Sequence, residues 1–196
     1  MIVKDIPIYD GDLIHHRFAY TYFRNRTLPI GNILAFRAPM KVEADGMIDL
    51  EDTLKNDYIY SEDAINFCWE IPGLDAFGAV AWQRLFNTQI ANILSSRYLN
   101  APIEVDGDDL MVHKEHDQHG IIQQKGKCSV SITYSRDGAA LGHTAINVTA
   151  GRQAPAFAYS TKLTDEQCEA FMKNVVDTFY QMNDDMFIAT TKLIVK

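Results

Sequence analysis

Three strand-like runs decide the fold: VDGDDLMV at residues 105–112, KGKCSVSITYS at 125–135 and GHTAINV at 142–148. Side chains alternate along a strand, so Lys127, Ser129 and Ser131 share one face of the second run. His143 and Asn147 likewise share one face of the third run. If the two runs pair as neighbours, we expect these polar groups on one surface. That surface is either the wall of a polar pocket or the solvated side of a sheet.

The rest of the chain mixes helices and strands. AINFCWEI (64–71) alternates strictly and is the clearest strand. Apolar spacing predicts helices over 13–24 and 75–97, and a capping box predicts that another helix begins after Thr164. The last dozen residues fit either a strand or a helix. Because no regular βαβ alternation is present, the fold class is α+β, with a mixed, mostly antiparallel sheet backed by helices.

The N-terminal third carries weaker signals. A run over 2–9 fits a short edge strand, and NILAFR (32–37) fits a strand that Pro39 stops. Residues 43–63 hold eight acidic residues and one lysine. Part of this acidic segment, 48–55, fits a helical turn.

Composition limits the classes of function. The chain of 196 residues, 47% hydrophobic and 22% charged, is expected to form one domain over residues 1–196. A net charge of −8 argues against a nucleic-acid partner, since that mode of binding needs a basic face. No apolar run approaches the roughly 20 residues of a membrane span, and the first residues do not form a signal peptide. Three widely spaced cysteines without a CxxC pair indicate reduced thiols of a cytoplasmic protein.

Several motifs together carry a resemblance to a known family: FRAPM, IDLED, GDDL, GKCSVSI and GHTAINV. Their order is similar to that in an uncharacterised conserved family, domain of unknown function 366, and the resemblance covers most of the chain. It implies the fold of the catalytic core of biotin and lipoate protein ligases and class II aminoacyl-tRNA synthetases. In that fold the ligand lies on one face of the sheet.

The resemblance also implies roles for individual residues. The ligases carry an arginine-rich glycine loop, an Asn-Asp-leading strand, a Gly-Lys-Lys-type strand and a His-Gly turn, in that order. Here this order is echoed at Phe36–Pro39, Asp108–Leu110, Lys125–Lys127 and His143. Lys127 would then contact an acyl carbonyl and a phosphate; the sequence leaves the cofactor open, and ATP with Mg²⁺ is the candidate that the resemblance implies. Ala-Pro-Met stands where the glycine loop should follow Arg37, and this departure puts adenylate formation in doubt.

The candidate catalytic residues are Lys127 and Arg37. Lys127 either stabilises developing negative charge on a carbonyl or phosphate, or is a solvated strand lysine. Arg37 either forks onto a carboxylate or phosphate, or forms an ion pair with the acidic segment 43–63. A shared functional site requires that Lys127, Arg37 and His143 converge on one hollow.

The remaining candidates are expected to bind ligand. Asp108 and Asp109 either hold Lys127 or bind Mg²⁺, or they serve only the turn that Gly107 begins. The other candidates share polar strand faces and either contact a ligand or are satisfied within the fold: Ser129, Ser131, His143 and Asn147.

A metal site is not predicted. His113, His116 and His119 suit a helix face by spacing, but they lie between two strands, so a polar hairpin tip is favoured over zinc. Cys128 lies on the apolar face of its strand and is assigned to the core.

Two functions follow. The first is an enzyme of the ligase-like class that binds a small carboxylic acid or acyl nucleotide. The second is a non-catalytic module on the same fold that binds a small ligand or a protein. A homodimer through an edge strand or the final helix is also expected, since uncovered edges invite pairing.

Overall fold

The structure is a computed structural model, and it describes residues 1–14, 18–23, 31–116, 122–192 and 194. Its α-helices are α1 (Phe18–Phe23), α2 (Leu50–Lys55), α3 (Ala76–Leu94) and α4 (Asp165–Thr191), with a 3₁₀ turn at Ala44–Gly46 and a π-helical turn at Ser95–Leu99. Its strands are β1 (Asn32–Val42), β2 (Ile59–Pro72), β3 (Ile103–Asp106), β4 (Asp109–His116), β5 (Ile122–Lys127), β6 (Ser129–Arg136) and β7 (Ala139–Thr149).

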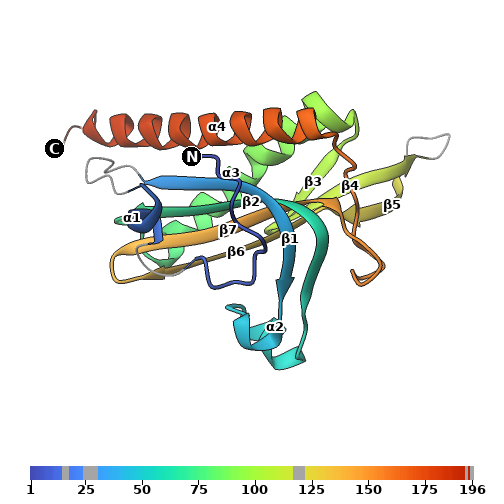
Figure 1. Ribbon diagram of the computed structural model, residues 1–196. Helices are drawn as coiled ribbons and strands as arrows, with labels where there is room; N and C mark the ends of the chain where they lie inside the picture. Colours follow the sequence, from blue (N-terminus) through green and yellow to red (C-terminus); the bar gives the residue numbers. More distant parts are fainter. Residues whose placement is uncertain (15–17, 24–30, 117–121, 193, 195–196) are drawn as a thin grey trace.

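The strands form two antiparallel sheets (Figure 1). The larger sheet has the order β1-β2-β7-β6, and the smaller has the order β3-β4-β5. The predicted class, α+β with an antiparallel sheet backed by helices, is confirmed. No helix within the described ranges is long and apolar enough to cross a membrane.

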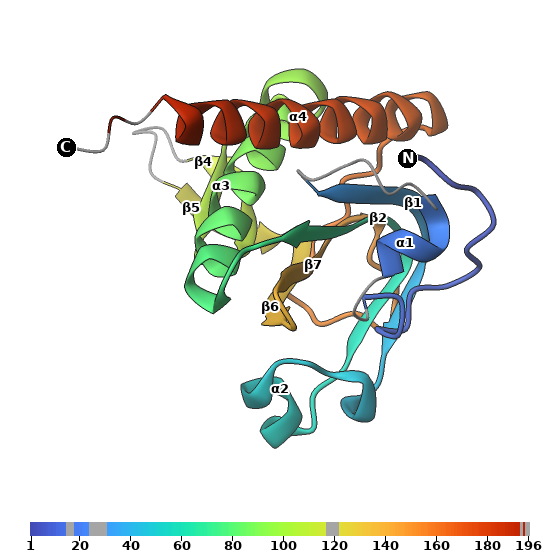
Figure 2. The same ribbon diagram turned by 90° about the vertical axis from the view of Figure 1, so that its left-hand side faces the viewer.

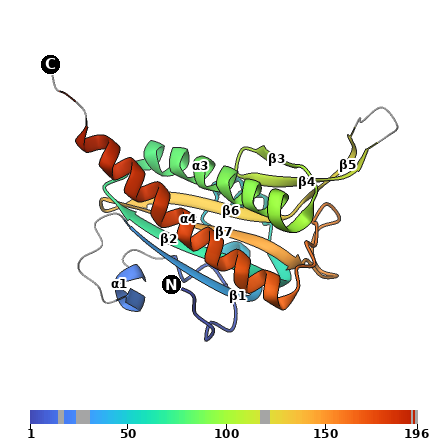
Figure 3. The same ribbon diagram turned by 90° about the horizontal axis from the view of Figure 1, so that it is seen from above.

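Helices α3 and α4 cover one face of the larger sheet (Figure 3). Their apolar stripes meet strand side chains in one cluster, in which Phe67, Trp69, Trp82, Phe86 and Phe179 are almost wholly buried. α4 begins at the predicted capping box, and it continues through most of the last dozen residues, which the sequence left open between strand and helix.

The opposite face of the sheet is only partly covered. The N-terminal segment and α1 pack a second apolar cluster against it, including Tyr9, Phe18 and Phe36. α2 stands apart from the rest of the molecule, at the end of the long β1–β2 hairpin (Figure 2). The uncovered part of this face, which α2 overhangs, is where the candidate site lies.

Two strand predictions are corrected near the N-terminus. Residues 2–9 form isolated parallel bridges to β1, through Ile2 and Tyr9, in place of a continuous strand. Pro39 does not end β1, because it lies at a register shift between Ala38 and Met40 and β1 is an edge strand. A proline, which has no N–H to donate, is tolerated at such a bulge.

The predicted strand over 125–135 is divided at Cys128. The Cys128 N–H donates to the carbonyl of Leu110 in β4, and its carbonyl accepts from the N–H of Asn147 in β7, each at 2.9 Å. Cys128 therefore joins the two sheets, and Lys127 at the end of β5 comes close to β7. Burial raises the pKa of the Cys128 thiol to about 12, consistent with a core residue.

Candidate functional site

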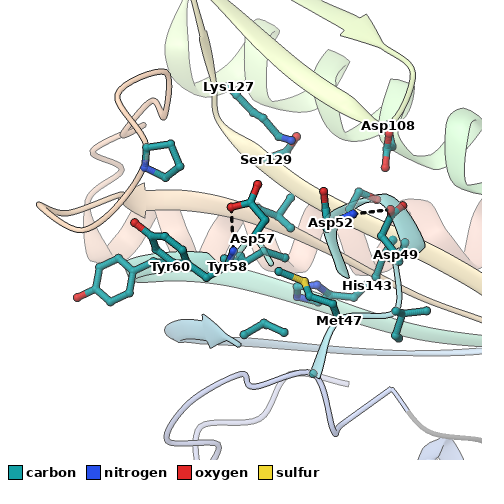
Figure 4. Close-up of a pocket in the computed structure, with 18 of the residues that line it drawn as sticks. Met47, Asp49, Asp52, Asp57, Tyr58, Tyr60, Asp108, Lys127, Ser129 and His143 are labelled. Carbon is teal, nitrogen blue, oxygen red and sulfur yellow. Dashed lines mark hydrogen bonds between the residues drawn. The ribbon is translucent and has the colours of Figure 1, made fainter. Parts of the chain in front are cut away.

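A cavity of about 410 Å³ lies between the uncovered sheet face, the segment that contains α2 and the loop that follows β7. We call residues 46–58 the α2 segment. The size of the cavity is within the range of small-molecule sites. In the view of Figure 4, Lys127 and Asp108 lie on one side of it, His143 and Met47 on the other, and Asp52 and Asp57 between them.

Lys127 is held at the cavity by its backbone and its side chain. Its N–H donates to the carbonyl of Phe157 at 2.9 Å, and its carbonyl accepts from the N–H of Tyr159 at 2.7 Å. Its ammonium pairs with Asp109 at 2.7 Å, and the lysine side chain is 29% exposed. An ammonium has three donors, so the pair with Asp109 leaves capacity to bind a ligand oxygen.

Asp108 and Asp109 both line the cavity, but their environments differ. The two-residue loop Gly107-Asp108 joins β3 to β4, and Gly107 has the positive φ of 61° that suits the first position of a type II′ turn. Burial raises the pKa of Asp108, although Arg84, 3.7 Å away, opposes this. Asp109 forms the ion pair with Lys127.

His143 forms part of the cavity floor and is 1% exposed. Tyr9 stacks on its ring, with 3.7 Å between centroids. The Nδ2 of Asn66 donates to the carbonyls of Ala38 and Ala64, so its Oδ1 is the acceptor for His143 Nε2, at 3.0 Å. His143 Nε2 therefore carries the proton, and burial lowers the pKa of the imidazole to about 3. The ring is a neutral group at neutral pH.

Asn147 also lines the cavity, on the same face of β7 as His143, and is 4% exposed. Its Oδ1 is buried and has no hydrogen-bond partner among the residues that the structure describes. A buried acceptor left unpaired costs roughly 1–3 kcal/mol, so a donor from a ligand is favoured at this position.

The α2 segment supplies a wall that the sequence analysis did not assign to the site. Asp49 caps α2 through the N–H groups of Glu51 and Asp52, and Asp57 accepts from the N–H of Tyr58. Burial raises the pKa of Asp52, and the nearby carboxylates of Asp49 and Asp57 raise it further. The only sequence signal for this wall was the high density of acidic residues over 43–63, but such a run is more often a solvent-exposed surface.

Ser129 and Ser131 are among the residues that line this cavity, but their hydroxyl groups already form hydrogen bonds within the fold. Ser131 pairs with Thr144, and its Oγ accepts from Gln83 and Asn87 of α3. The Oγ of Ser129 accepts from the N–H of Leu110. The register places His143 opposite Ile132, so the histidine and the serines lie on opposite faces of the sheet. The expectation that these polar groups share one face of the sheet is therefore wrong, because β7 is buried on both faces and carries polar groups on each, although the serines, His143 and Asn147 all line the cavity.

Arg37 does not line the cavity, and the predicted convergence of Lys127, Arg37 and His143 is wrong for this residue. Along β1, Arg37 lies on the same face of the strand as Ile33 and Ala35, and this face is turned towards the helices. Its guanidinium binds Asp63 at 2.7 Å and Asp165 at 2.6 Å. The hydrogen bonds to Asp63 contribute most to raising the pKa of Arg37. Of the two interpretations of Arg37, the ion pair with the acidic segment 43–63 is therefore the one that the structure supports.

The remaining wall is apolar and comes from β6, the β1–β2 hairpin and the loop after β7. Its members include Val42, Met47, Ile59, Val130, Ile132, Pro155 and Phe157. The site thus combines an apolar lining with charged groups at its rim, as small-molecule sites commonly do.

His113 and His116 lie within β4 and not between two strands as expected. His113 interacts with Glu104 at 3.3 Å, while His119 lies outside the described residues. Within the described part of the chain, no group of three or more His, Cys, Asp or Glu side chains is placed to hold a metal ion.

Comparison with solved structures defines the class of fold. A putative lipoate protein ligase from T. acidophilum with bound lipoic acid has a TM-score of 0.54 at 13% identity, over 92% of this chain and 85% of that chain. A biotin protein ligase from Aquifex aeolicus in complex with biotin and ATP has a TM-score of 0.54 at 11% identity, over 93% and 72%. The chain has a biotin/lipoate protein ligase-like fold.

The family is shown by its own model. The chain belongs to the family Domain of unknown function (DUF366), whose model matches residues 1–194. A structure described as a protein of unknown function from Pyrococcus horikoshi has a TM-score of 0.83 at 21% identity, over 100% of this chain and 97% of that chain. No curated protein sequence matches the chain. The resemblance that the sequence motifs carried is confirmed.

Proposed function

We propose that this protein binds a small organic ligand in the cavity beside Lys127, as a binding module on a ligase-like fold. The observation that carries the proposal is the placement of the Lys127 ammonium at a cavity of about 410 Å³ whose floor holds an unpaired buried acceptor, Asn147 Oδ1. The Lys127 ammonium anchors a carbonyl, carboxylate or phosphate oxygen of the ligand. The apolar body of the ligand packs against Val130, Ile132 and Phe157.

The residues present do not fit the triphosphate of ATP. A triphosphate needs a surplus of cationic or backbone donors. The described cavity lining has six carboxylates and two ammonium groups, and one of those ammonium groups, Lys55, pairs with Glu51. Binding without adenylate formation is therefore the better supported function. The ligase function is the second candidate, which the likeness in fold favours.

The test is a thermal-shift and calorimetric screen with lipoate, biotin and octanoate, and with ATP in the presence and absence of Mg²⁺. A ligand at a hundredfold excess over its Kd stabilises the folded state by about 2.7 kcal/mol. We expect a shift with at least one acyl compound, and we expect Lys127→Ala to abolish it. Lys125→Ala is the matched control, because Lys125 lies on the same strand but pairs with Glu104, away from the cavity lining.

Two results would count against the proposal. If none of these compounds shifts the melting temperature, ligand binding of this class is rejected. If Lys127→Ala retains the full shift, the site is elsewhere. Pyrophosphate exchange with each acid tests the second candidate, and a positive signal would replace simple binding with ligase chemistry.

The homodimer remains a prediction. The N-terminal segment covers the edge of β1, since Val3 and Tyr9 donate to carbonyls of that strand. The end of α4, where Phe187 and Ile188 are exposed, is then the more suitable contact. Light scattering after size exclusion measures the mass directly, and a monomer at all concentrations would reject the dimer.

A further inference from the structure

We infer that the ligand of this cavity carries a positively charged amine or guanidinium group, which binds between the α2 segment and the cavity floor. The inference rests on the proposed function and narrows the class of ligand. The anchor for the other end of the ligand remains Lys127.

The first argument is the balance of charge in the lining. Its acidic side chains outnumber its ammonium groups by four: Asp49, Glu51, Asp52, Asp57, Asp108 and Asp109 against Lys55 and Lys127. Both lysines are already paired, with Glu51 at 2.6 Å and with Asp109 at 2.7 Å. A ligand that is only an anion would enter a field of its own sign.

Three of these carboxylates form no direct ion pair with a lysine or arginine among the described residues, although Lys127 and Lys55 are near enough to lower the pKa of Asp52: Asp49, Asp52 and Asp57. They come from one segment, and Figure 4 shows them beside the cavity. Asp49 and Asp57 raise the pKa of Asp52, so the three are close enough to repel one another. A cation placed between them removes this repulsion and forms charge-assisted hydrogen bonds.

The second argument is independent of charge and comes from the floor. Asn147, 4% exposed, has a buried Oδ1 without a partner among the described residues. His143 uses its Nε2–H on Asn66, so its other ring nitrogen is an acceptor. The floor therefore holds an unpaired hydrogen-bond acceptor, Asn147 Oδ1, and a protonated amine supplies donors without acceptors. The ligand must match this pattern.

Three probes with the same eight-carbon chain test the inference: octanoate, octylamine and 8-aminooctanoate. We expect octylamine and 8-aminooctanoate to bind the wild-type protein at least about tenfold more tightly than octanoate, as measured by calorimetry. Asp52→Asn, which preserves shape and removes one charge, should weaken both amines about tenfold and leave octanoate unchanged or tighter. Asp185→Asn, on the exposed side of α4, removes the same charge far from the cavity and should have no effect.

The outcomes separate the two claims. If octanoate binds in a Lys127-dependent manner and neither amine binds more tightly, the inference is overturned while the proposed function stands. If the amines bind equally to wild type and Asp52→Asn, the cation is not at the α2 segment, and the inference is again overturned. Binding of Ca²⁺ or Mg²⁺ alone, lost in Asp52→Asn and without amine binding, would assign the carboxylates to a metal ion. Failure of all three probes would also overturn it.

Discussion

Acid should destabilise this protein through one buried side chain, His143. Burial lowers the pKa of its imidazole from 6.5 to about 3 in the folded state. Below pH 6.5 the imidazole binds a proton in the unfolded chain but stays neutral in the folded chain. The free energy of unfolding therefore falls as pH falls, until the pH reaches the pKa of the folded state. Between about pH 7.5 and pH 4.5 this single group removes about 2–3 kcal/mol of stability.

The neighbours of His143 do not compensate for this loss. Tyr9 stacks on the ring, Asn66 accepts its Nε2–H, and Cys68 and Ile132 lie opposite it on the adjacent strands. Burial raises the pKa of Tyr9 and of Cys68, so both are neutral throughout this pH range.

The assay is urea denaturation of the wild type and of His143→Gln across this pH range. Other groups titrate in both proteins, so the difference between the two slopes isolates His143. We expect the wild type to lose about 2–3 kcal/mol more than the variant. A second measurement is independent of folding of the variant: the NMR signal of the His143 ring should stay that of a neutral imidazole at pH 4.5. If the His143 ring titrates near pH 6.5, or if the wild type and His143→Gln lose stability equally as pH falls, His143 is not a buried, neutral group in the cavity floor.

Three further predictions concern the scaffold of the site. Asn87→Ala should lower the free energy of unfolding by about 2–4 kcal/mol in urea, because Asn87 donates to the Asp108 carbonyl at 2.9 Å and to Ser131 Oγ at 3.1 Å; a loss below 1 kcal/mol would contradict this. Gly142→Ala should cost about 1–3 kcal/mol or prevent folding, since the new Cβ would lie 2.1 Å from a ring carbon of Trp69, and unchanged stability would mean that the ring lies elsewhere. Thr164→Ala should cost about 1 kcal/mol by removing the capping box of α4, as read from the melting temperature, while Thr164→Ser should be nearly neutral.

Local patterns made much of the fold predictable. The capping box at Thr164 and the alternation over 64–71 depend on neighbours along the chain, and both elements are present. The alternation still gave only half of the environment of β2, because both faces of this central strand are buried. Alternation of apolar and polar side chains identifies one buried face of a strand, but a strand that lies between two layers buries both of its faces.

The site was less predictable, because it depends on register. Lys127, Asp108, Asp109, His143 and Asn147 all line one cavity. Ser129 and Ser131 of β6 also line it, but the register puts them on the opposite face of the sheet from His143, and Arg37 of β1 is outside the lining. A shift of one residue in pairing reverses the face of every side chain, and the sequence of two strands does not fix that choice.

The acidic wall was missed for a related reason. Asp52 lies roughly 75 residues before Lys127 in the sequence, and only the long β1–β2 hairpin brings α2 over the sheet. Contacts between segments so distant in sequence are set by tertiary packing, which composition over 43–63 does not report.

The most direct test of the ligand cavity is a crystal structure of the protein with whichever eight-carbon probe binds most tightly. We expect density in the cavity, with the ammonium of the probe within hydrogen-bond distance of Asp52 and the far end of its carbon chain towards Lys127. Density only in a second pocket, which is lined by Arg37, Asp165 and Glu166 at the start of α4, with the cavity unchanged, would contradict this.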